Sequence, residues 1–158
     1  MILDRPTTLR LEDEAATARL GAALAGALQA GEAVCLSGPL GAGKSVLARA
    51  LIRARTRPDE EVPSPTFTLV QFYDGAGLAL AHFDLYRLES PDEAYEIGLD
   101  EALDEGAALI EWPERLALLP PHRLEVRITP ETGGSEGARR AQLVPHGAWE
   151  GRTVELGS

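Results

Sequence analysis

The sequence contains very little of several residue types. Of its 158 residues one is cysteine, one is lysine and none is asparagine. A single cysteine, Cys35, excludes a disulfide within the chain, and its apolar surroundings are typical of a buried thiol rather than a reactive one. The longest apolar run, residues 20–28, is too short to span a bilayer, and the first five residues do not resemble a secretion signal. We therefore expect a cytoplasmic protein with no membrane partner.

Basic residues are also scarce relative to acidic ones. The chain has 15 Lys and Arg against 25 Asp and Glu, which gives a formal net charge of −10. This balance argues against a general nucleic-acid binder, because such proteins need a basic face, and we expect no DNA partner. A protein partner or a small, localised anion site remains compatible. The length predicts a single domain over residues 1–158.

One stretch matches the phosphate-binding pattern G-x-x-x-x-G-K-[ST], with Gly38, Gly43, Lys44 and Ser45 at its fixed positions. The only lysine stands where a flexible ammonium reaches the β- and γ-phosphates. Residues 32–36 form an apolar run before the loop, and apolar residues at helical spacing follow it. A strand-to-helix turn of this kind presents backbone N–H groups to a phosphate, whereas a glycine-rich turn without a ligand is the weaker alternative. The predicted nucleotide contacts are Gly38, Leu40, Gly41, Ala42, Gly43, Lys44, Ser45 and Val46.

Two apolar segments end in acids that could serve a metal ion. Residues 69–84 are typical of a β-hairpin whose second strand ends at Asp84, where a Walker B acid would hold Mg²⁺ opposite the hydroxyl of Ser45. Many strands end in Asp, so this signal is weak alone. A second apolar strand ends at Glu111, which could compete for the metal, orient water or form a strand-end ion pair. Trp112 is either a packed aromatic or a nucleotide contact, with packing favoured. His82 shares a strand face with Asp84, and a packed or hydrogen-bonded role is favoured over a catalytic one.

The rest of the sequence indicates scaffold. Residues 7–11 are a candidate edge strand, and leucines at 20, 24 and 28 predict a helix. Two prolines make residues 62–68 a stiff loop that presents Ser64 and Thr66. Residues 90–93 resemble a capping box, with Gly98 as a stop before a second short helix. Residues 123–128 and 141–144 predict an antiparallel pair that closes the sheet. The basic cluster near residues 49–57 is interpreted as solvated helix-end charge rather than an RNA or partner contact.

Four blocks occur in a fixed order: residues 38–45, 64–70, 82–88 and 109–114. Together they resemble the bacterial TsaE family, also called YjeE, over about residues 8–130. The resemblance implies that residues 8–130 are the core of the domain and that 131–158 form a C-terminal strand and tail. The resemblance implies an α/β, single-domain P-loop NTPase fold with a mixed central sheet flanked by helices and a β-hairpin. It also implies ATP and Mg²⁺ as cofactors, a TsaB–TsaD-like protein complex as partner, and a role in threonylcarbamoyladenosine modification of tRNA. Contact with tRNA is expected to be indirect.

On this view the chain is a weak, partner-dependent ATPase. The expected catalytic residues are Lys44, Asp84 and Glu111, the metal ligands Ser45, Asp84 and Glu111, and the additional nucleotide contacts Thr66 and Trp112. Thr66 would sense the γ-phosphate. No arginine is marked by a motif as an arginine finger. Arg87 is a candidate, although packing of its side chain against Asp92 or Glu93 is favoured.

Three other functions share the phosphate loop. A small nucleotide or metabolite kinase would need an Arg-bearing lid, and no such insertion is visible. A GTPase is disfavoured because the guanine motif N-K-x-D cannot be formed without asparagine or a second lysine. The third alternative is a nucleotide-gated binding module with incidental ATPase activity.

Overall fold

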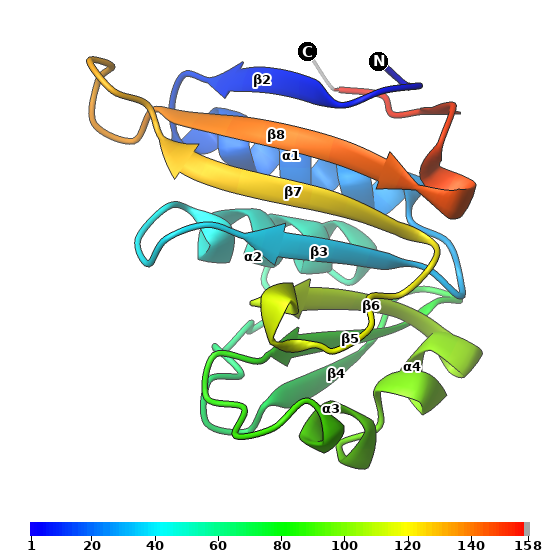
Figure 1. The fold of residues 1–158 in the computed structure, drawn as a ribbon. Coiled ribbons are helices and arrows are strands. Elements are labelled where there is room, and N and C mark those ends of the chain that lie inside the picture. The colour runs from blue at the N-terminus through cyan, green and yellow to red at the C-terminus, as the bar shows by residue number, and fades with distance from the viewer. Residues whose placement is uncertain (157–158) are drawn as a thin grey trace.

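A seven-stranded mixed sheet forms the centre of the computed structural model, which describes residues 1–156 (Figure 1). The strand order is β2-β8-β7-β3-β6-β5-β4. Strands β5, β6, β3 and β7 are parallel neighbours, whereas β4 pairs with β5, and β8 with β7 and β2, in antiparallel fashion. The strand bounds are β2 (Thr7–Leu11), β3 (Ala33–Ser37), β4 (Val70–Asp74), β5 (Ala79–Asp84), β6 (Gly106–Glu111), β7 (Arg123–Pro130) and β8 (Arg139–His146).

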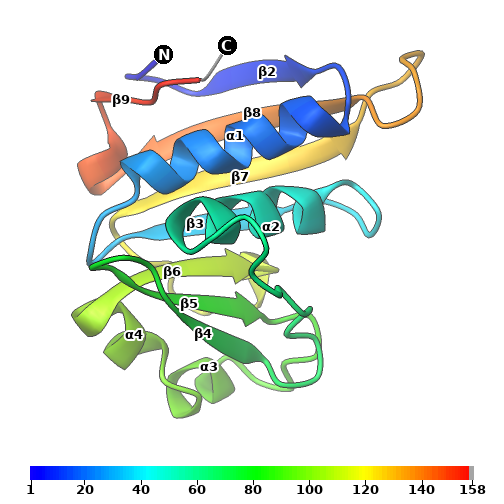
Figure 2. The ribbon, with the colours of Figure 1, turned by 180° about the vertical axis from the view of Figure 1, so that it is seen from behind.

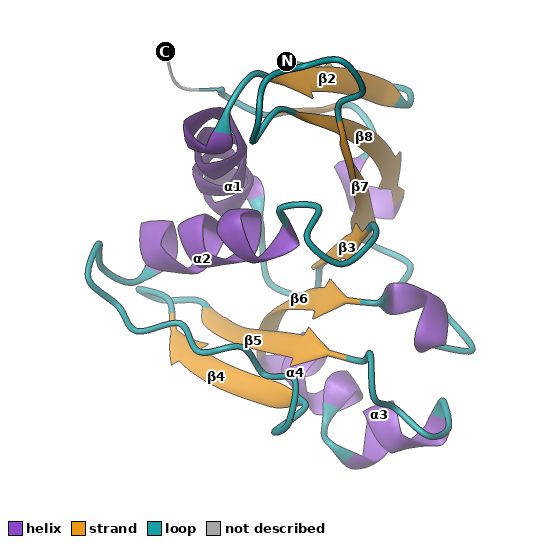
Figure 3. Cartoon of the chain, turned by 90° about the vertical axis from the view of Figure 1, so that its left-hand side faces the viewer, coloured by secondary structure: helices purple, strands orange, loops and turns teal. Residues whose placement is uncertain are grey.

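Helices cover the two faces of the sheet unequally. The long helices α1 (Glu14–Ala27) and α2 (Lys44–Arg55) lie side by side on one face (Figure 2). The short helices α3 (Asp92–Glu96) and α4 (Leu99–Glu105) pack near β4, β5 and β6 (Figure 3). Two 3₁₀ turns, η1 (Pro113–Arg115) and η2 (Gly147–Trp149), complete the helical elements. In residues 1–156 no helix combines the length and apolarity needed to cross a membrane.

The central strand β3 explains how one sheet supports two cores. Its alternate side chains point to opposite faces, so Val34 and Leu36 join the core under α1 and α2. Ala33 and Cys35 join the second core with Phe83 of β5. Burial raises the pKa of the Cys35 thiol to about 12, as expected for a structural rather than a reactive cysteine.

Most sequence predictions of elements are confirmed. The edge strand at residues 7–11, both hairpin strands and the two short helices are present, with Gly98 at φ +98° between α3 and α4. One of the two hydrogen bonds of the predicted capping box is present: the backbone N–H of Ser90 donates to Oε1 of Glu93 at 3.2 Å. The pair β7–β8 is present, but it lies inside the sheet between β3 and the edge strand β2.

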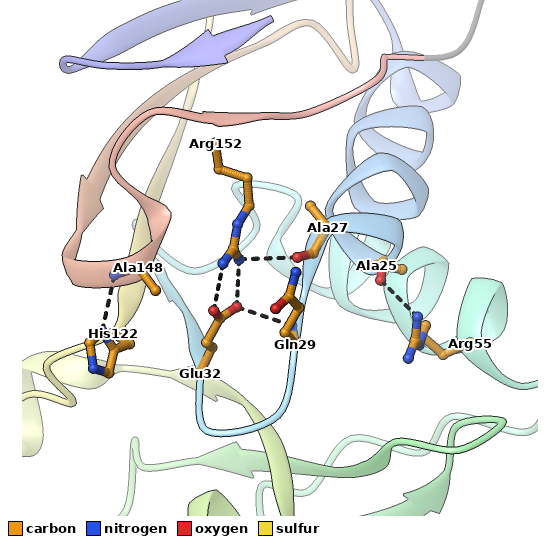
Figure 4. A network of polar contacts seen from close by, with 8 residues as sticks. All are labelled: Ala25, Ala27, Gln29, Glu32, Arg55, His122, Ala148 and Arg152. Atoms are coloured by element: carbon orange, nitrogen blue, oxygen red, sulfur yellow. Dashed lines mark hydrogen bonds and ion pairs between the residues drawn. The ribbon is translucent and has the colours of Figure 1, made fainter.

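The end of the described chain is tied to the start of β3 (Figure 4). After η2, β9 (Arg152–Thr153) pairs with β1 (Ile2–Leu3). The guanidinium of Arg152 donates to both carboxylate oxygens of Glu32 at 2.6 Å and to the carbonyl of Ala27 at 3.1 Å. Trp149 beside it is fully buried. These contacts make the C-terminal segment part of the core.

Candidate nucleotide-binding site

The carboxyl ends of three adjacent parallel strands define the candidate site. In the register of the sheet, Asp84 at the end of β5 is paired with Glu111 at the end of β6, and Glu111 with Leu36 of β3. The glycine-rich loop follows β3 and leads into α2 (Figure 3). Because parallel strands deliver their carboxyl ends to the same edge, both acids lie next to the loop.

Two glycines are required by the shape of the loop. A Cβ on Gly38 would lie 2.1 Å from the carbonyl oxygen of Ile128 on β7, so any larger residue would displace the loop from the sheet. Gly43 precedes α2 with φ +105°, a left-handed conformation that side chains rarely adopt. The sequence therefore folds locally into a tight turn that opens onto the N-terminus of α2, where the helix dipole favours an anion.

Lys44 is buried, and its side chain is hydrogen-bonded to the backbone of the phosphate loop. Its Nζ donates to the carbonyl of Gly38 at 2.7 Å and lies 3.8 Å from the ring centroid of Trp112. Burial lowers the pKa of Lys44, and the nearby carboxylates of Glu111, Glu114 and Asp84 oppose this effect in part. An ammonium has three donors, so this group keeps hydrogen-bonding capacity for a ligand.

Asp84 is linked to the proline-stiffened loop. Its Oδ2 accepts from the hydroxyl of Thr66 at 3.0 Å, and that hydroxyl lies 2.6 Å from the hydroxyl of Ser64. The other oxygen, Oδ1, accepts from the backbone N–H of Tyr86 at 3.1 Å. The loop over residues 64–68 is thus hydrogen-bonded directly to the acid at the strand end. A change at Asp84 would therefore alter the hydrogen bonding of the loop.

Glu111 is bonded to a buried histidine. Nε2 of His82 lies 2.7 Å from Oε2 of Glu111, and Nδ1 of His82 has no hydrogen-bond partner within residues 1–156. The prediction that His82 is a hydrogen-bonded residue is confirmed. Alternation along β5 predicted the strand face of His82 but not its partner, because the partner depends on the register between β5 and β6.

Strained backbone flanks the two acids. Leu69, at the end of the loop that carries Thr66, and Trp112, directly after Glu111, both have left-handed φ values of 69° and 60°. Such conformations cost free energy and concentrate at functional sites. The ring of Trp112 packs on Tyr86 at a centroid distance of 4.8 Å, so Trp112 is both a packed aromatic and a wall of the site.

These residues enclose a pocket of about 180 Å³. It is lined by nine of the predicted residues and by one more residue, Ser64: Leu40, Gly41, Gly43, Lys44, Ser45, Ser64, Thr66, Asp84, Glu111 and Trp112. Three predicted contacts do not line it. Ala42 and Gly38 are buried in the loop, and Val46 lines a separate hollow between α1 and α2.

The donor set suits a hard cation that also binds phosphate. Ser45, Asp84 and Glu111 offer only oxygen ligands, which Mg²⁺ prefers. In residues 1–156 no group of three or more His, Cys, Asp or Glu side chains could hold a metal ion alone. A magnesium ion here would therefore complete its coordination with phosphate oxygens and water, as in P-loop proteins.

One arginine differs from expectation, and a second contacts the phosphate loop without having been predicted. Arg87 does not pair with Asp92 or Glu93 in the described chain; its guanidinium lies 4.9 Å from the ring of Phe67, on the loop over residues 64–68. Sequence reasoning missed Arg139 entirely. From the start of β8 it donates to the carbonyls of Ala42 at 2.7 Å and Gly41 at 3.3 Å, behind the phosphate loop. No local motif marks Arg139.

A protein-family model described as "Threonylcarbamoyl adenosine biosynthesis protein TsaE" matches residues 11–141. The chain belongs to the TsaE family. It is 42% identical over 122 residues to the tRNA threonylcarbamoyladenosine biosynthesis protein TsaE of Rickettsia conorii, covering 77% of this chain and 69% of the relative. The TsaE protein of Nostoc sp. is 37% identical over 150 residues, covering 92% and 90%.

The TsaE-family assignment agrees with the fold. The crystal structure of YdiB from Bacillus subtilis resembles this structure with a TM-score of 0.71 at 24% identity, covering 93% of this chain and 88% of that one. This likeness and the family match confirm the predicted α/β fold with a mixed central sheet flanked by helices. The family match confirms the predicted place of this TsaE-family chain in tRNA threonylcarbamoyladenosine biosynthesis.

Proposed function

We propose that the chain binds ATP with Mg²⁺ and hydrolyses it to cycle a TsaB–TsaD-like complex that makes threonylcarbamoyladenosine on tRNA. The observation that carries this proposal is the convergence of Lys44, Ser45, Asp84 and Glu111 on one pocket beside the phosphate loop. Together with the loop backbone, these residues offer the chemistry that a nucleoside triphosphate requires. They supply a cation for phosphate, a hydroxyl and carboxylates for the metal, and backbone N–H groups at a helix start.

The roles follow from position. Lys44 and the loop amides would bind the β- and γ-phosphates, and Ser45 and Asp84 would hold the magnesium ion, which would neutralise phosphate charge. Glu111, held by His82, orients water or contributes to the metal site. Thr66 bonds to Asp84 and is placed to respond when the γ-phosphate is present or lost.

Turnover by the isolated chain is expected to be slow. No arginine is among the residues that line the pocket in the described chain. An arginine finger is worth about 10³ to 10⁵ in rate where it is present. A partner-dependent ATPase is therefore the form of activity that this pocket supports best.

The first test replaces the only lysine. Lys44→Ala removes charge-assisted hydrogen bonds worth about 2–4 kcal/mol in total, so ATP should bind roughly 30- to 1,000-fold more weakly. Calorimetric titration with ATP and Mg²⁺ measures this effect. Unchanged ATP affinity together with unchanged ATPase activity in Lys44→Ala would overturn the assignment.

The acids are tested with the partners present. Asp84→Asn and Glu111→Gln should lower ATP hydrolysis in the assembled complex, and Asp59→Asn, an exposed acid after α2, is the matched control. Normal hydrolysis by either site variant would refute its proposed role.

Measuring partner binding with ATP, with ADP and without nucleotide separates turnover from gating. A nucleotide-gated module would bind its partner normally with a non-hydrolysed ATP analogue and support modification without turnover.

A further inference from the structure

One face of the sheet is left open. Among residues 1–156 no helix lies over the front of β2, β8 and β7, whereas α1 and α2 cover the back (Figures 1 and 2). Strand residues that point backwards, such as Val126 and Leu143, belong to the core under those helices. The second core includes no residue of β2, β7 or β8. Forward-pointing side chains of these strands such as Arg127 and Arg140 are exposed.

The open face carries arginines and neutral hydrogen-bond donors. We call it the outer sheet face and define it by six residues: Thr8, Arg10, Arg127, Thr129, Arg140 and Gln142. In the register, Arg10 lies directly opposite Arg140, and Arg127 directly opposite Gln142. Five of the six, all except Arg10, line a hollow of about 260 Å³.

The positive charge on this face is only partly neutralised. Arg140 donates to Glu131 at 3.1 and 3.4 Å, so its charge is paired within the chain. Arg10 and Arg127 are exposed and have no ion pair within residues 1–156. Farther along the face, Arg123 and His146 both pair with Glu125, so they add no unpaired positive charge. Two free guanidiniums thus remain beside the hollow.

This arrangement is unfavourable for the fold alone. Like charges directly opposite each other on neighbouring strands repel, as Arg10 and Arg140 do here. The chain as a whole is acidic, with a net charge of −10, so the gathering of arginines on one face is not a consequence of composition. An anion on the outer sheet face would relieve the repulsion.

We propose that the outer sheet face binds the phosphate backbone of tRNA directly. Arg10, Arg127 and Arg140 would contact phosphate oxygens, and the hydroxyl and amide groups of Thr8, Thr129 and Gln142 would donate to phosphates or ribose. A protein partner is less well matched, because a stable protein interface needs buried apolar or aromatic anchors. The six residues of this face supply none.

The inference goes beyond the proposed ATPase function and beyond the expectation of indirect tRNA contact. The outer sheet face shares no residue with the nucleotide pocket. Nucleotide binding and tRNA binding can therefore fail separately, and Lys44→Ala should bind tRNA as the unchanged chain does.

The test compares two double variants with the same change in charge. Arg10→Gln/Arg127→Gln removes the free cations of the outer sheet face. Arg19→Gln/Arg49→Gln removes two exposed arginines from α1 and α2 on the opposite face and is the matched control. Binding of a fluorescently labelled, unmodified tRNA transcript to each full chain is titrated between about 20 and 200 mM salt. Nucleotide affinity is measured in parallel.

The outer-face variant should bind tRNA about tenfold more weakly than the control variant. Its plot of log affinity against log salt should be shallower by about 1.4–1.8, because two phosphate contacts are lost. ATP affinity should be the same in both variants. Equal loss in the two variants, or no salt-dependent tRNA binding by the unchanged chain, overturns the proposal. If only capture of the partner complex is lost, the face binds protein and the proposal is wrong.

Discussion

Two buried charged clusters lie at opposite ends of β3, and they are built differently. Before the strand, Glu32 is fully paired with the guanidinium of Arg152, which also donates to the carbonyl of Ala27 (Figure 4). After the strand, the only hydrogen bond that Lys44 donates from its side chain within residues 1–156 goes to the carbonyl of Gly38. Neither Asp84 nor Glu111 forms an ion pair with Lys or Arg in the described chain. One cluster is closed and the other is open.

The pKa directions show the same contrast. The side-chain hydrogen bond to Glu32 raises the pKa of Arg152. Burial lowers the pKa of Lys44, because its nearby carboxylates only partly compensate for the lost water. A closed cluster uses its charges on itself and stabilises the fold. An open cluster keeps donors and acceptors for a ligand, and a strongly charged ligand such as a nucleotide with its metal ion completes it.

The largest expected effect comes from opening the closed cluster. Glu32→Gln leaves the guanidinium of Arg152 buried without its carboxylate and should lower the free energy of unfolding by about 3–5 kcal/mol. At about 2–4 °C per kcal/mol for a chain of this size, the midpoint of thermal unfolding should fall by roughly 6–20 °C. Denaturant titration and thermal unfolding measure the loss, and ATP affinity below the transition should be unchanged.

An exposed pair is the control for this change. Asp59→Asn breaks the contact with Arg57 at the surface and should cost less than about 1 kcal/mol. If Glu32→Gln costs no more than Asp59→Asn, the buried pair does not hold the C-terminal segment as described.

A smaller effect is expected from Arg139, which links β8 to the open cluster. Its guanidinium donates to the carbonyls of Ala42 and Gly41 and so fixes the loop whose N–H groups face the ligand. Arg139→Lys keeps the charge but loses the planar fork, and ATP affinity should fall about 10- to 150-fold, since one charge-assisted bond is worth about 1.5–3 kcal/mol. Arg140→Lys, the next residue along the strand, is exposed and should leave ATP affinity unchanged. An Arg139→Lys variant with full ATP affinity would show that the loop holds its shape without this arginine.

The open cluster was largely predictable from the sequence, whereas the closed cluster was not. The phosphate loop, the strand before it and the apolar strands ending at Asp84 and Glu111 are local patterns, because motif and periodicity are read from neighbouring residues. The contact of Arg152 with Glu32 joins residues 120 apart in the chain, and that of Arg139 with Ala42 joins residues 97 apart. Neither is marked by a motif.

The physical reason is that these contacts depend on strand order. Arg139 reaches the loop only because β7 lies beside β3 and β8 beside β7. The sequence predicted the β7–β8 pair but not its place within the sheet. His82 is an intermediate case: alternation along β5 indicated its face, but its bond to Glu111 required the parallel register with β6.

The smallest and most specific effect is the pH dependence of the open cluster. In the proposed function, phosphate binding needs the protonated ammonium of Lys44, and in the chain without a ligand burial lowers the pKa of this ammonium below its ordinary value of 10.5. ATP affinity should therefore fall as pH rises, with a break below 10.5. The buried thiol of Cys35 and the phenol of Tyr73, whose pKa values are raised, do not titrate first.

The same shift has a consequence for stability with a definite sign. The relevant pH window lies between the lowered pKa of Lys44 in the folded chain and 10.5, and within it the unfolded chain binds one more proton than the folded chain does. The contribution of Lys44 to the free energy of unfolding therefore increases with pH across this window. That contribution is lost as pH falls through the pKa of Lys44 in the folded chain. ATP affinity changes in the opposite direction. Lys44→Arg separates the two effects, because a guanidinium stays charged: ATP binding should be weaker at neutral pH but should show no break near alkaline pH. A break that persists in Lys44→Arg would assign the titration to another group and remove Lys44 from the centre of the open cluster.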